Sequence, residues 1–440
     1  MTVPPVKSKS HVFAVIIPSR LCAPIGPGRP GTVKPGTLTR PAACRAGRPL
    51  SDFVLAHGGR PPRPHHRYFL VRGGARAGAA AAFNLAAHGR VQILEMEDAP
   101  GYHTTGRSAA LYTETYGNRV VRAITSASRD FLSHPPEGFV DGPVLTPRGT
   151  LLAATAETEA ILDQAERDAD ALGAVTERLH GNALFDRAPY LARTVVTGGL
   201  FEPAAMDMDV DLLHRGFLRG TARQGGQLTC RAPVHTLTRD DGKWIAATPA
   251  GDFRAPVVVN AAGAWADHIA ELAGVAVIGL IPKRRSAFTF DAPESLDLEA
   301  MPATIAVDES WYVKPEAGRL LASPADETPS PAGDAQPEAI DLAIAADRVQ
   351  RHTDFTIRRM HSRWAGLRSF VADKTFVVGF APGHDGFLWC AGQGGYGIQT
   401  SAAMGEITAA LAIGGALPAA VTDRGVTAAD LSPGRPALAG

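Results

Sequence analysis

The residues with the clearest chemical meaning in this 440-residue chain form a turn over residues 73–78, which reads Gly-Gly-Ala-Arg-Ala-Gly and follows the apolar run Tyr68 to Val71. A Gly-x-Gly-x-x-Gly turn between a strand and a helix lets the backbone approach a pyrophosphate. Glu95 lies about 20 residues further on, at the position expected to hydrogen-bond a ribose. Gly73, Gly74, Gly78 and Glu95 are therefore candidate dinucleotide ligands.

The turn departs from this motif at three positions. Ala75 replaces the middle glycine, and Arg72 and Arg76 stand where apolar residues are usual. We expect the Ala75 methyl group and the two arginines to crowd the pyrophosphate, so that a dinucleotide is bound less tightly than by the intact motif. A glycine-rich turn that binds no nucleotide is the alternative.

The surrounding pattern predicts a β-α-β unit with a strand over 68–71, a helix over 79–88 that ends at Gly89, and a strand over 90–95. Two later apolar runs, 257–263 and 387–391, are expected in the same sheet because they read as buried strands that end in small residues. A helix over 398–413 is expected after the glycine-rich segment 392–397. The nucleotide-binding lobe is thus assembled from three separated stretches.

Between these stretches the pattern changes to alternation, which places Arg285, Ala287 and Thr289 on one face of a strand. The runs 311–314 and 319–322 flank a Pro-Glu-Ala-Gly segment, typical of a hairpin. We expect an exposed loop over 328–336 and a helix from Pro337 to about Phe355. An antiparallel sheet is therefore predicted beside the nucleotide-binding lobe.

Composition excludes several classes of function. Lysine plus arginine and aspartate plus glutamate number 44 each, which does not favour binding of nucleic acid. The four cysteines are too far apart for a disulfide framework or a zinc site, which fits a cytoplasmic protein. No apolar run has the length of a membrane-spanning helix. Residues 1–66 are rich in proline and arginine and are expected to be a disordered extension without function, although their acid-poor composition also mimics a transit peptide.

Five segments resemble, in order and with nearly constant spacing, the FAD-dependent D-amino-acid oxidase superfamily, and most closely its soluble D-arginine dehydrogenases. The resemblance runs from about Tyr68 to Pro433. It implies an α/β, two-lobed fold with a glutathione-reductase-like FAD-binding Rossmann lobe (67–142, 202–280 and 364–430), an antiparallel-sheet substrate lobe (143–201 and 281–363) and a tail (431–440). The segments are Gly101 to Ala110, Asn260 to Trp265, Pro282 to Phe288, Trp364 to Phe370 and Gln393 to Gln399.

The same resemblance implies the site residues. Arg368 clamps the substrate carboxylate, for which the planar guanidinium is better suited than lysine, Tyr312 is a second donor and Arg285 lines the pocket. Tyr116, Thr113 and Gly395 complete the catalytic set. The residues expected to bind FAD are Gly73, Gly74, Gly78, Glu95, Thr105, Arg107, Ser108, Ala109, Val234, Gly263, Gly394, Gly395, Gly397, Ile398 and Gln399.

The implied reaction is oxidative deamination of a D-amino acid to a 2-oxo acid and ammonia, by hydride transfer to flavin N5 and then to an electron acceptor such as a quinone. A glycine or sarcosine-type oxidase that uses oxygen, or a flavin-deficient pseudoenzyme, are the alternatives. Two departures bear on the substrate. Leu111 replaces a histidine of the D-arginine dehydrogenase pattern, and Gly149-Thr150 stands where that pattern has a glutamate. We expect uncharged, medium-sized D-amino acids, unless Glu114 supplies the missing carboxylate.

Overall fold

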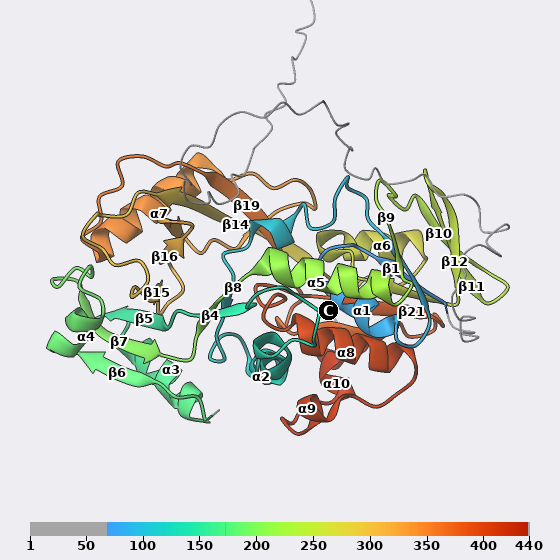
Figure 1. The fold of residues 1–440 in the computed structure, drawn as a ribbon, viewed down its shortest axis with the longest axis horizontal. Coiled ribbons are helices and arrows are strands. Elements are labelled where there is room, and N and C mark those ends of the chain that lie inside the picture. The colour runs from blue at the N-terminus through green and yellow to red at the C-terminus, as the bar shows by residue number, and fades with distance from the viewer. Residues whose placement is uncertain (1–67, 172, 439–440) are drawn as a thin grey trace, which may run out of the picture. The chain divides into compact units, whose positions relative to one another are not determined.

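The computed structural model describes residues 68–171 and 173–438 (Figure 1). The expected disordered extension, 1–66, lies outside the described residues. Within the described part, no helix is long and apolar enough to cross a membrane.

A six-stranded sheet with the order β20-β21-β13-β1-β2-β9 forms the centre of the nucleotide-binding lobe. All neighbours in it are parallel except β20 and β21. The carboxyl ends of β1, β2 and β13 therefore meet at one edge, where ligands bind in folds of this kind. The elements are β1 (Tyr68–Arg72), β2 (Arg90–Leu94), β9 (Gln227–Thr229), β13 (Val257–Asn260), β20 (Val377–Phe380) and β21 (Phe387–Ala391).

Alternation along β1 gives the sheet two apolar faces. Val71 packs in a core with residues of α1, α2 and α8, whereas Leu70 packs against α6 and the meander β10-β11-β12. Helix α1 lies against both α5 and α8 (Figure 1), and a Cβ on Gly405 of α8 would lie 2.6 Å from Ala80 O. Small residues on both helices thus permit close packing. The elements are α1 (Arg76–Leu85), α2 (Arg119–Ser133), α5 (Val210–Arg223), β10 (Thr236–Asp240), β11 (Lys243–Thr248), β12 (Gly251–Ala255), η2 (Gly263–Trp265), α6 (Ala266–Leu272) and α8 (Ser401–Ala412).

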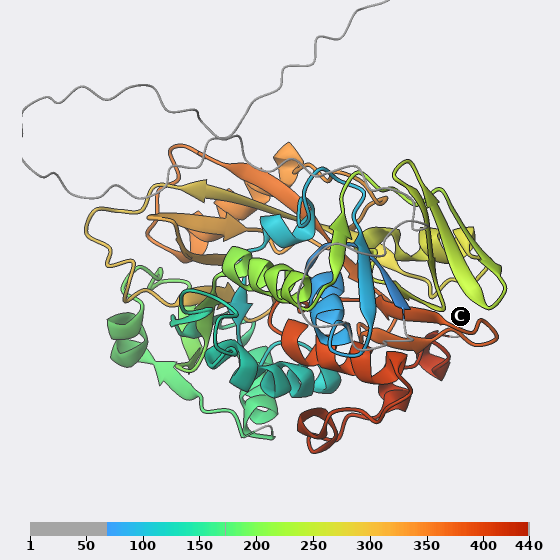
Figure 2. The same cartoon turned by 45° about the vertical axis from the view of Figure 1, so that its right-hand side comes forward.

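A nine-stranded, mostly antiparallel sheet with the order β18-β14-β17-β16-β15-β5-β7-β6 forms the second lobe, with β19 also paired to β14 (Figure 2). The predicted hairpin is present, but its turn consists of Ala317 and Gly318, both at positive φ, and Pro315 belongs to β16. The elements are β5 (Thr150–Thr155), α3 (Glu159–Ala171), β6 (Glu177–His180), α4 (Gly181–Arg187), β7 (Val196–Glu202), β14 (Ile281–Phe290), β15 (Ala303–Ala306), β16 (Tyr312–Glu316), β17 (Arg319–Ser323), β18 (Thr328–Pro329), α7 (Ala339–His352) and β19 (Arg363–Phe370).

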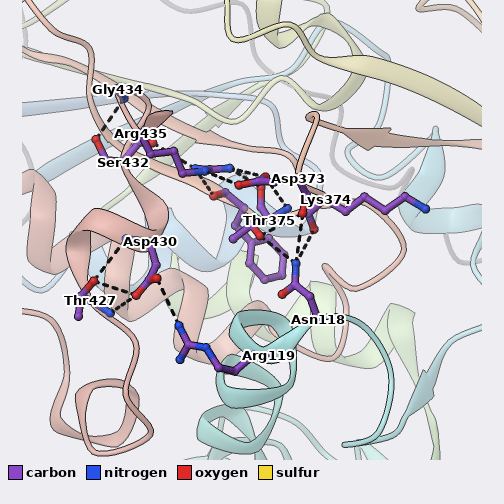
Figure 3. A network of polar contacts seen from close by, with 11 residues as sticks. Asn118, Arg119, Asp373, Lys374, Thr375, Thr427, Asp430, Ser432, Gly434 and Arg435 are labelled. Carbon is purple, nitrogen blue, oxygen red and sulfur yellow. Dashed lines mark hydrogen bonds and ion pairs between the residues drawn. The ribbon is translucent and has the colours of Figure 1, made fainter. Parts of the chain in front are cut away.

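A small sheet, β3-β8-β4, and the C-terminal segment complete the described chain. The segment after Leu431, which we expected to be a tail, is docked by the buried guanidinium of Arg435, which bonds to Asp373 and to the carbonyls of Thr375 and Phe376 (Figure 3). The elements are η1 (Thr104–Arg107), β3 (Leu111–Tyr112), β4 (Leu145–Pro147), β8 (Met206–Met208), α9 (Ala419–Thr422), α10 (Ala428–Leu431) and η3 (Pro436–Leu438).

The structure corrects three expected boundaries. Helix α1 begins at Arg76, three residues before the expected start, and α8 begins at Ser401 because residues 397–400 form a turn. Strand β19 was expected in the nucleotide-binding lobe, but eight of its residues pair with β14 of the nine-stranded sheet. The other domain boundaries remain predictions.

Candidate active site

Two cavities with shared walls lie at the carboxyl edge of the parallel sheet. The larger has a volume of about 700 Å³ and the smaller of about 110 Å³. The larger is within the range of ligand pockets in proteins. Residues that line both are Arg76, Thr104, Arg107, Gly366 and Gly394.

The glycine-rich turn forms one wall of the smaller cavity, and two of its glycines are required by packing. Gly73 has a φ of 107°, and a Cβ on it would lie 2.4 Å from Ala261 O. A Cβ on Gly78 would lie 1.8 Å from Gly73 O. The Gly74 amide donates to Glu95 Oε2 at 2.9 Å, so Glu95 fixes the turn and lines the cavity.

The three departures from the glycine motif all face this cavity. Ala75 has an ordinary extended backbone (φ −66°, ψ 172°), so alanine causes no backbone strain there. Arg72 and Arg76 are buried, and Arg72 Nη1 and Arg76 Nε have no hydrogen-bond partner among the described residues. Burial lowers the pKa of Arg72 to about 10, partly offset by Glu95. Burial, with repulsion from Arg368, lowers the pKa of Arg76 to about 9.

These features fit a dinucleotide. A diphosphate can be bound by a tight glycine turn, by the start of a helix beside that turn and by buried cationic groups that lack a hydrogen-bond partner. Gly263, at a φ of 56°, lines the same cavity from the segment that follows β13. Val234 lies elsewhere, in the apolar core beneath the sheet, and is absent from the walls of both cavities.

The loop after residue 103 joins the two cavities. Thr105 is buried and its Oγ1 accepts from the Arg76 amide at 3.4 Å. Ser108 Oγ donates to Thr104 O at 2.8 Å, and Ala109 lines the larger cavity. The Arg107 guanidinium instead binds Asp334 and donates to the carbonyls of Ala335 and Ala365 at 2.9 and 3.0 Å. Arg107 therefore anchors the loop over 333–336 to the site.

The glycine-rich segment before α8 brings its backbone against two arginines. A Cβ on Gly395 would lie 2.8 Å from Arg368 Nη1, and one on Gly397 would lie 3.2 Å from Arg76 Nε. A Cβ on Gly394 would lie 2.6 Å from the Phe370 ring. Any side chain at these positions would displace a neighbour. Ile398 and Gln399 follow them in the wall of the larger cavity.

Arg368 lies at the junction of the two lobes, in the wall of the larger cavity. Its Nη1 donates to the Tyr116 hydroxyl at 3.2 Å, and Tyr312 lines the same cavity from β16. Burial lowers the Arg368 pKa, but the hydroxyl groups of Tyr116 and Tyr312 outweigh burial, so the net pKa is raised. The guanidinium therefore stays charged.

Arg285 reaches the cavity from β14, with Nε donating to Asp326 O at 2.8 Å. Its Nη2 makes no hydrogen bond within the described chain and lies 3.7 Å from Glu327 Oε1. Burial, followed by repulsion from Arg368, lowers the pKa of Arg285. Glu327 also forms ion pairs with Lys283 and Lys374 at 2.9 and 3.2 Å. Its single negative charge is therefore shared among three cations, Lys283, Lys374 and Arg285.

The loop that carries Thr113 is held by a residue that the sequence analysis missed. Buried Glu202 accepts from Thr113 Oγ1 and Thr115 Oγ1, both at 2.6 Å, and from the Glu114 amide at 3.0 Å. An acid directly after the apolar pair Leu200-Phe201 was the available signal. The Glu114 carboxylate instead accepts from Tyr112 OH at 2.5 Å and pairs with Arg129, and it is absent from the cavity wall.

Comparison with protein families matches residues 69–411 to the DAO family, whose description is FAD-dependent oxidoreductase. The chain belongs to this family. Its cofactor is FAD, as the sequence predicts, and the two-lobed α/β fold with an FAD-binding Rossmann lobe is also confirmed. The particular closeness to D-arginine dehydrogenases is not confirmed.

Human dimethylglycine dehydrogenase is 32% identical over 140 residues, which are 31% of this chain and only 16% of that protein. Glycine oxidase of Geobacillus kaustophilus is 24% identical over 300 residues, 66% of this chain and 73% of the relative. Its crystal structure matches with a TM-score of 0.68 at 22% identity and covers 79% of this chain and 95% of the oxidase. Iminodiacetate oxidase from a Chelativorans species matches with a TM-score of 0.70 at 20% identity, over 83% and 98%.

Proposed function

We propose that this FAD-dependent oxidoreductase oxidises the α-carbon–nitrogen bond of a D-amino acid with an uncharged, medium-sized side chain. The contact between Arg368 and Tyr116 in the wall of the larger cavity carries the proposal. A charged guanidinium next to hydroxyl donors is what an α-carboxylate requires. The D configuration rests on the resemblance of the Arg285, Tyr312 and Arg368 segments to D-arginine dehydrogenases.

Each residue of the cavity has a defined role in this proposal. Arg368 holds the carboxylate through two parallel hydrogen bonds, Tyr116 orients the guanidinium, and Tyr312 donates a further hydrogen bond. Arg285 adds positive charge. Together they fix the α-carbon in one position, and correct positioning of the reacting atoms lowers the barrier to reaction.

FAD, when bound, accepts the two electrons and the hydrogen that leave the α-carbon. Residues of the smaller cavity, including Glu95 and the turn over 73–78, would hold its adenosine diphosphate half, and the segment over 394–397 would contact the flavin. The resulting imino acid hydrolyses to a 2-oxo acid and ammonia. The acceptor that reoxidises the cofactor is predicted to be a quinone or a similar compound.

The walls of the larger cavity favour an uncharged side chain. Leu111, Leu152 and Ile305 line it, and Thr150 contributes only a hydroxyl group. The Glu202 carboxylate already accepts three hydrogen bonds, and the Glu114 carboxylate pairs with Arg129, so neither is available to a substrate. Among the acids that line the cavity, Glu327 is paired with Lys283 and Lys374, and Glu309 is exposed. A cationic side chain would therefore find no unpaired buried carboxylate in the described wall, and it needs one because an unpaired buried charge is strongly unfavourable.

Oxidation of glycine or of an N-substituted glycine is the second candidate. It is favoured by the names of the relatives, which include glycine oxidase and dimethylglycine dehydrogenase. The two candidates differ in the group they present to the apolar wall. A D-amino acid would pack its side chain against Leu152 and Ile305, whereas glycine has no side chain on the α-carbon to make this contact.

The deciding experiment is anaerobic bleaching of the flavin absorbance of the purified protein by a panel of D-leucine, D-methionine, L-leucine, glycine and sarcosine. Fast bleaching by the D-amino acids alone is expected. Bleaching by sarcosine or glycine at a higher rate than by D-leucine would replace the proposal with the second candidate. Hydrogen peroxide formation on readmission of air then separates an oxidase from a dehydrogenase.

A further inference from the structure

We infer that Arg72 and Arg76 form a two-arginine anion site that binds the diphosphate of the dinucleotide through side-chain charge. The intact glycine motif binds it mainly through the backbone. The inference rests on FAD binding and is independent of the amino acid that is oxidised. On this inference the two arginines strengthen binding of the dinucleotide, whereas the sequence alone suggests that they weaken it by crowding the pyrophosphate.

The two arginines stand on either side of the glycine turn. Arg72 is the last residue of β1 and Arg76 the first of α1, and both line the smaller cavity. Both residues are more than nine-tenths buried, with relative exposures of 7% and 8%. Arg72 Nη1 and Arg76 Nε nevertheless have no hydrogen-bond partner in the described chain.

Neither guanidinium forms an ion pair with a carboxylate among the described residues. Glu95 attracts Arg72, but its two oxygens accept from the backbone amides of Gly74 and Glu97. The charged group that acts most on Arg76 is Arg368, which repels it. Among residues 68–171 and 173–438, the Arg76 side chain makes one hydrogen bond, a long one of 3.4 Å from Nη1 to Ser108 Oγ. Two buried cations near a single carboxylate leave a net positive charge, which is unfavourable until an anion binds.

The start of α1 adds to the same site. The helix has ten residues and no acidic residue in its first turn. The N-terminus of a helix attracts an anion, and the first residues of α1 line the same cavity as Arg72 and Arg76. The Ala75 methyl hinders close approach of a diphosphate to the backbone, whereas charged side chains act over a longer distance. The charges of Arg72 and Arg76 thus compensate for the backbone contact with the diphosphate that the Ala75 methyl group hinders.

Two consequences follow for the protein without flavin. The site should bind other compounds that carry a diphosphate, so ADP should compete with FAD. The affinity for FAD should also fall as salt rises, because side-chain charges are screened. Replacing both arginines by methionine should stabilise the apoprotein against heat while it weakens FAD binding, since buried unpaired charges are removed.

The test compares Arg72→Met, Arg76→Met and the double variant with Arg90→Met. Arg90 is an exposed arginine on β2, where it contacts Tyr68. Dissociation constants of FAD are measured by flavin fluorescence at low and high salt, ADP competition is measured alongside, and apoprotein melting temperatures are recorded. Turnover is not needed, so failure here is distinct from failure of the proposed reaction.

Each single substitution is expected to weaken FAD binding by about tenfold, the equivalent of one charge-assisted hydrogen bond. The double variant should lose most of the salt dependence, and Arg90→Met should match the parent. If the double variant binds FAD as tightly as the parent or more tightly, the arginines crowd the site and the inference is wrong. If either single variant fails to fold, ADP competition in the other still decides, because an unchanged ADP affinity contradicts the inference.

Discussion

The Arg368 guanidinium donates to the Tyr116 hydroxyl at 3.2 Å, although 252 residues separate the two in the chain. Arg368 comes from β19 of the nine-stranded sheet, and Tyr116 comes from the loop before α2. Tyr116 in turn packs edge-on against Tyr396, with ring centroids 5.0 Å apart. The contact therefore joins the substrate lobe, the loop before α2 and the segment before α8 at one point.

Replacing Arg368 by lysine should lower kcat/KM for D-leucine by about 100-fold. Lysine keeps the charge but loses the fork that holds a carboxylate in one orientation, and a small misplacement of the reacting carbon has a cost of this order. Arg363→Lys, on an exposed position of the same strand, is the control. Near-normal turnover in Arg368→Lys would remove this residue from the site.

Replacing Tyr116 by phenylalanine should raise KM for the amino acid by about tenfold, since one hydrogen bond to a charged group is lost. The effect should be much smaller when Arg368 is already lysine, because the hydroxyl acts by orienting the guanidinium. A double-mutant cycle on kcat/KM measures this coupling. Additive effects of the two substitutions would show that Tyr116 acts independently.

Replacing Glu202 by alanine should loosen the loop over 113–115. Three donors, two of them the hydroxyls of Thr113 and Thr115, would lose their acceptor, at about 1 to 3 kcal/mol for each one left buried and unpaired. We expect a lower free energy of unfolding and faster proteolysis of this loop. Glu202→Gln retains an acceptor and should lose less. Equal stability of both variants and the parent would contradict the assigned role.

The C-terminal segment should contribute to stability through Arg435 and Asp373 (Figure 3). Arg435→Met should lower the free energy of unfolding by about 3 kcal/mol, because a buried charge pair is broken. Burial raises the pKa of Asp373, but the bonds from Arg435 and from the Thr375 amide outweigh it, so the pKa is lowered. The stabilisation is then present above the unfolded pKa, about 4, and lost as pH falls below it. Denaturant unfolding at pH 7 and pH 3.5 should show a smaller difference in Asp373→Asn than in the parent.

Local pattern was enough to predict the elements that carry the FAD site. The apolar run before Gly73, the alanine-rich helix that ends near Gly89 and the strand before Glu95 were identified by their composition and by the glycines between them, and the structure has all three. The helix start at Arg76 was missed because an arginine following a glycine-rich turn reads as loop. Here its side chain is buried beside the cavity instead.

Long-range partners could not be read from the sequence. Glu202 acts on a loop 87 to 89 residues earlier, and Arg435 on a turn 62 residues earlier. Neither has a local motif, since a buried acid and a buried arginine are recognised only once the sheet and the C-terminal segment have folded around them. The same limit applies to β19, whose pairing with β14 depends on the order of strands in the sheet.

The substrate side chain should be uncharged, so kcat/KM for D-leucine should exceed that for D-arginine. The Glu114 carboxylate is held by Tyr112 and Arg129, and to reach the cavity it would have to break both contacts. Four acids of the described chain line the cavity, and three of them are paired with cations: Asp168 with Arg122, Glu327 with Lys283 and Lys374, and Asp373 with Arg435. The fourth, Glu309, is exposed, so its charge is solvated and gains little from a cationic side chain. Specificity constants for both amino acids are to be compared in the parent, Glu114→Gln and Glu309→Gln. We expect the preference for D-leucine in all three. If the parent strongly prefers D-arginine and Glu114→Gln abolishes that preference, the loop rearranges on binding. If Glu309→Gln abolishes the preference, the cationic side chain is recognised at the rim of the cavity. If the preference for D-arginine survives both substitutions, the proposal of an uncharged pocket is wrong.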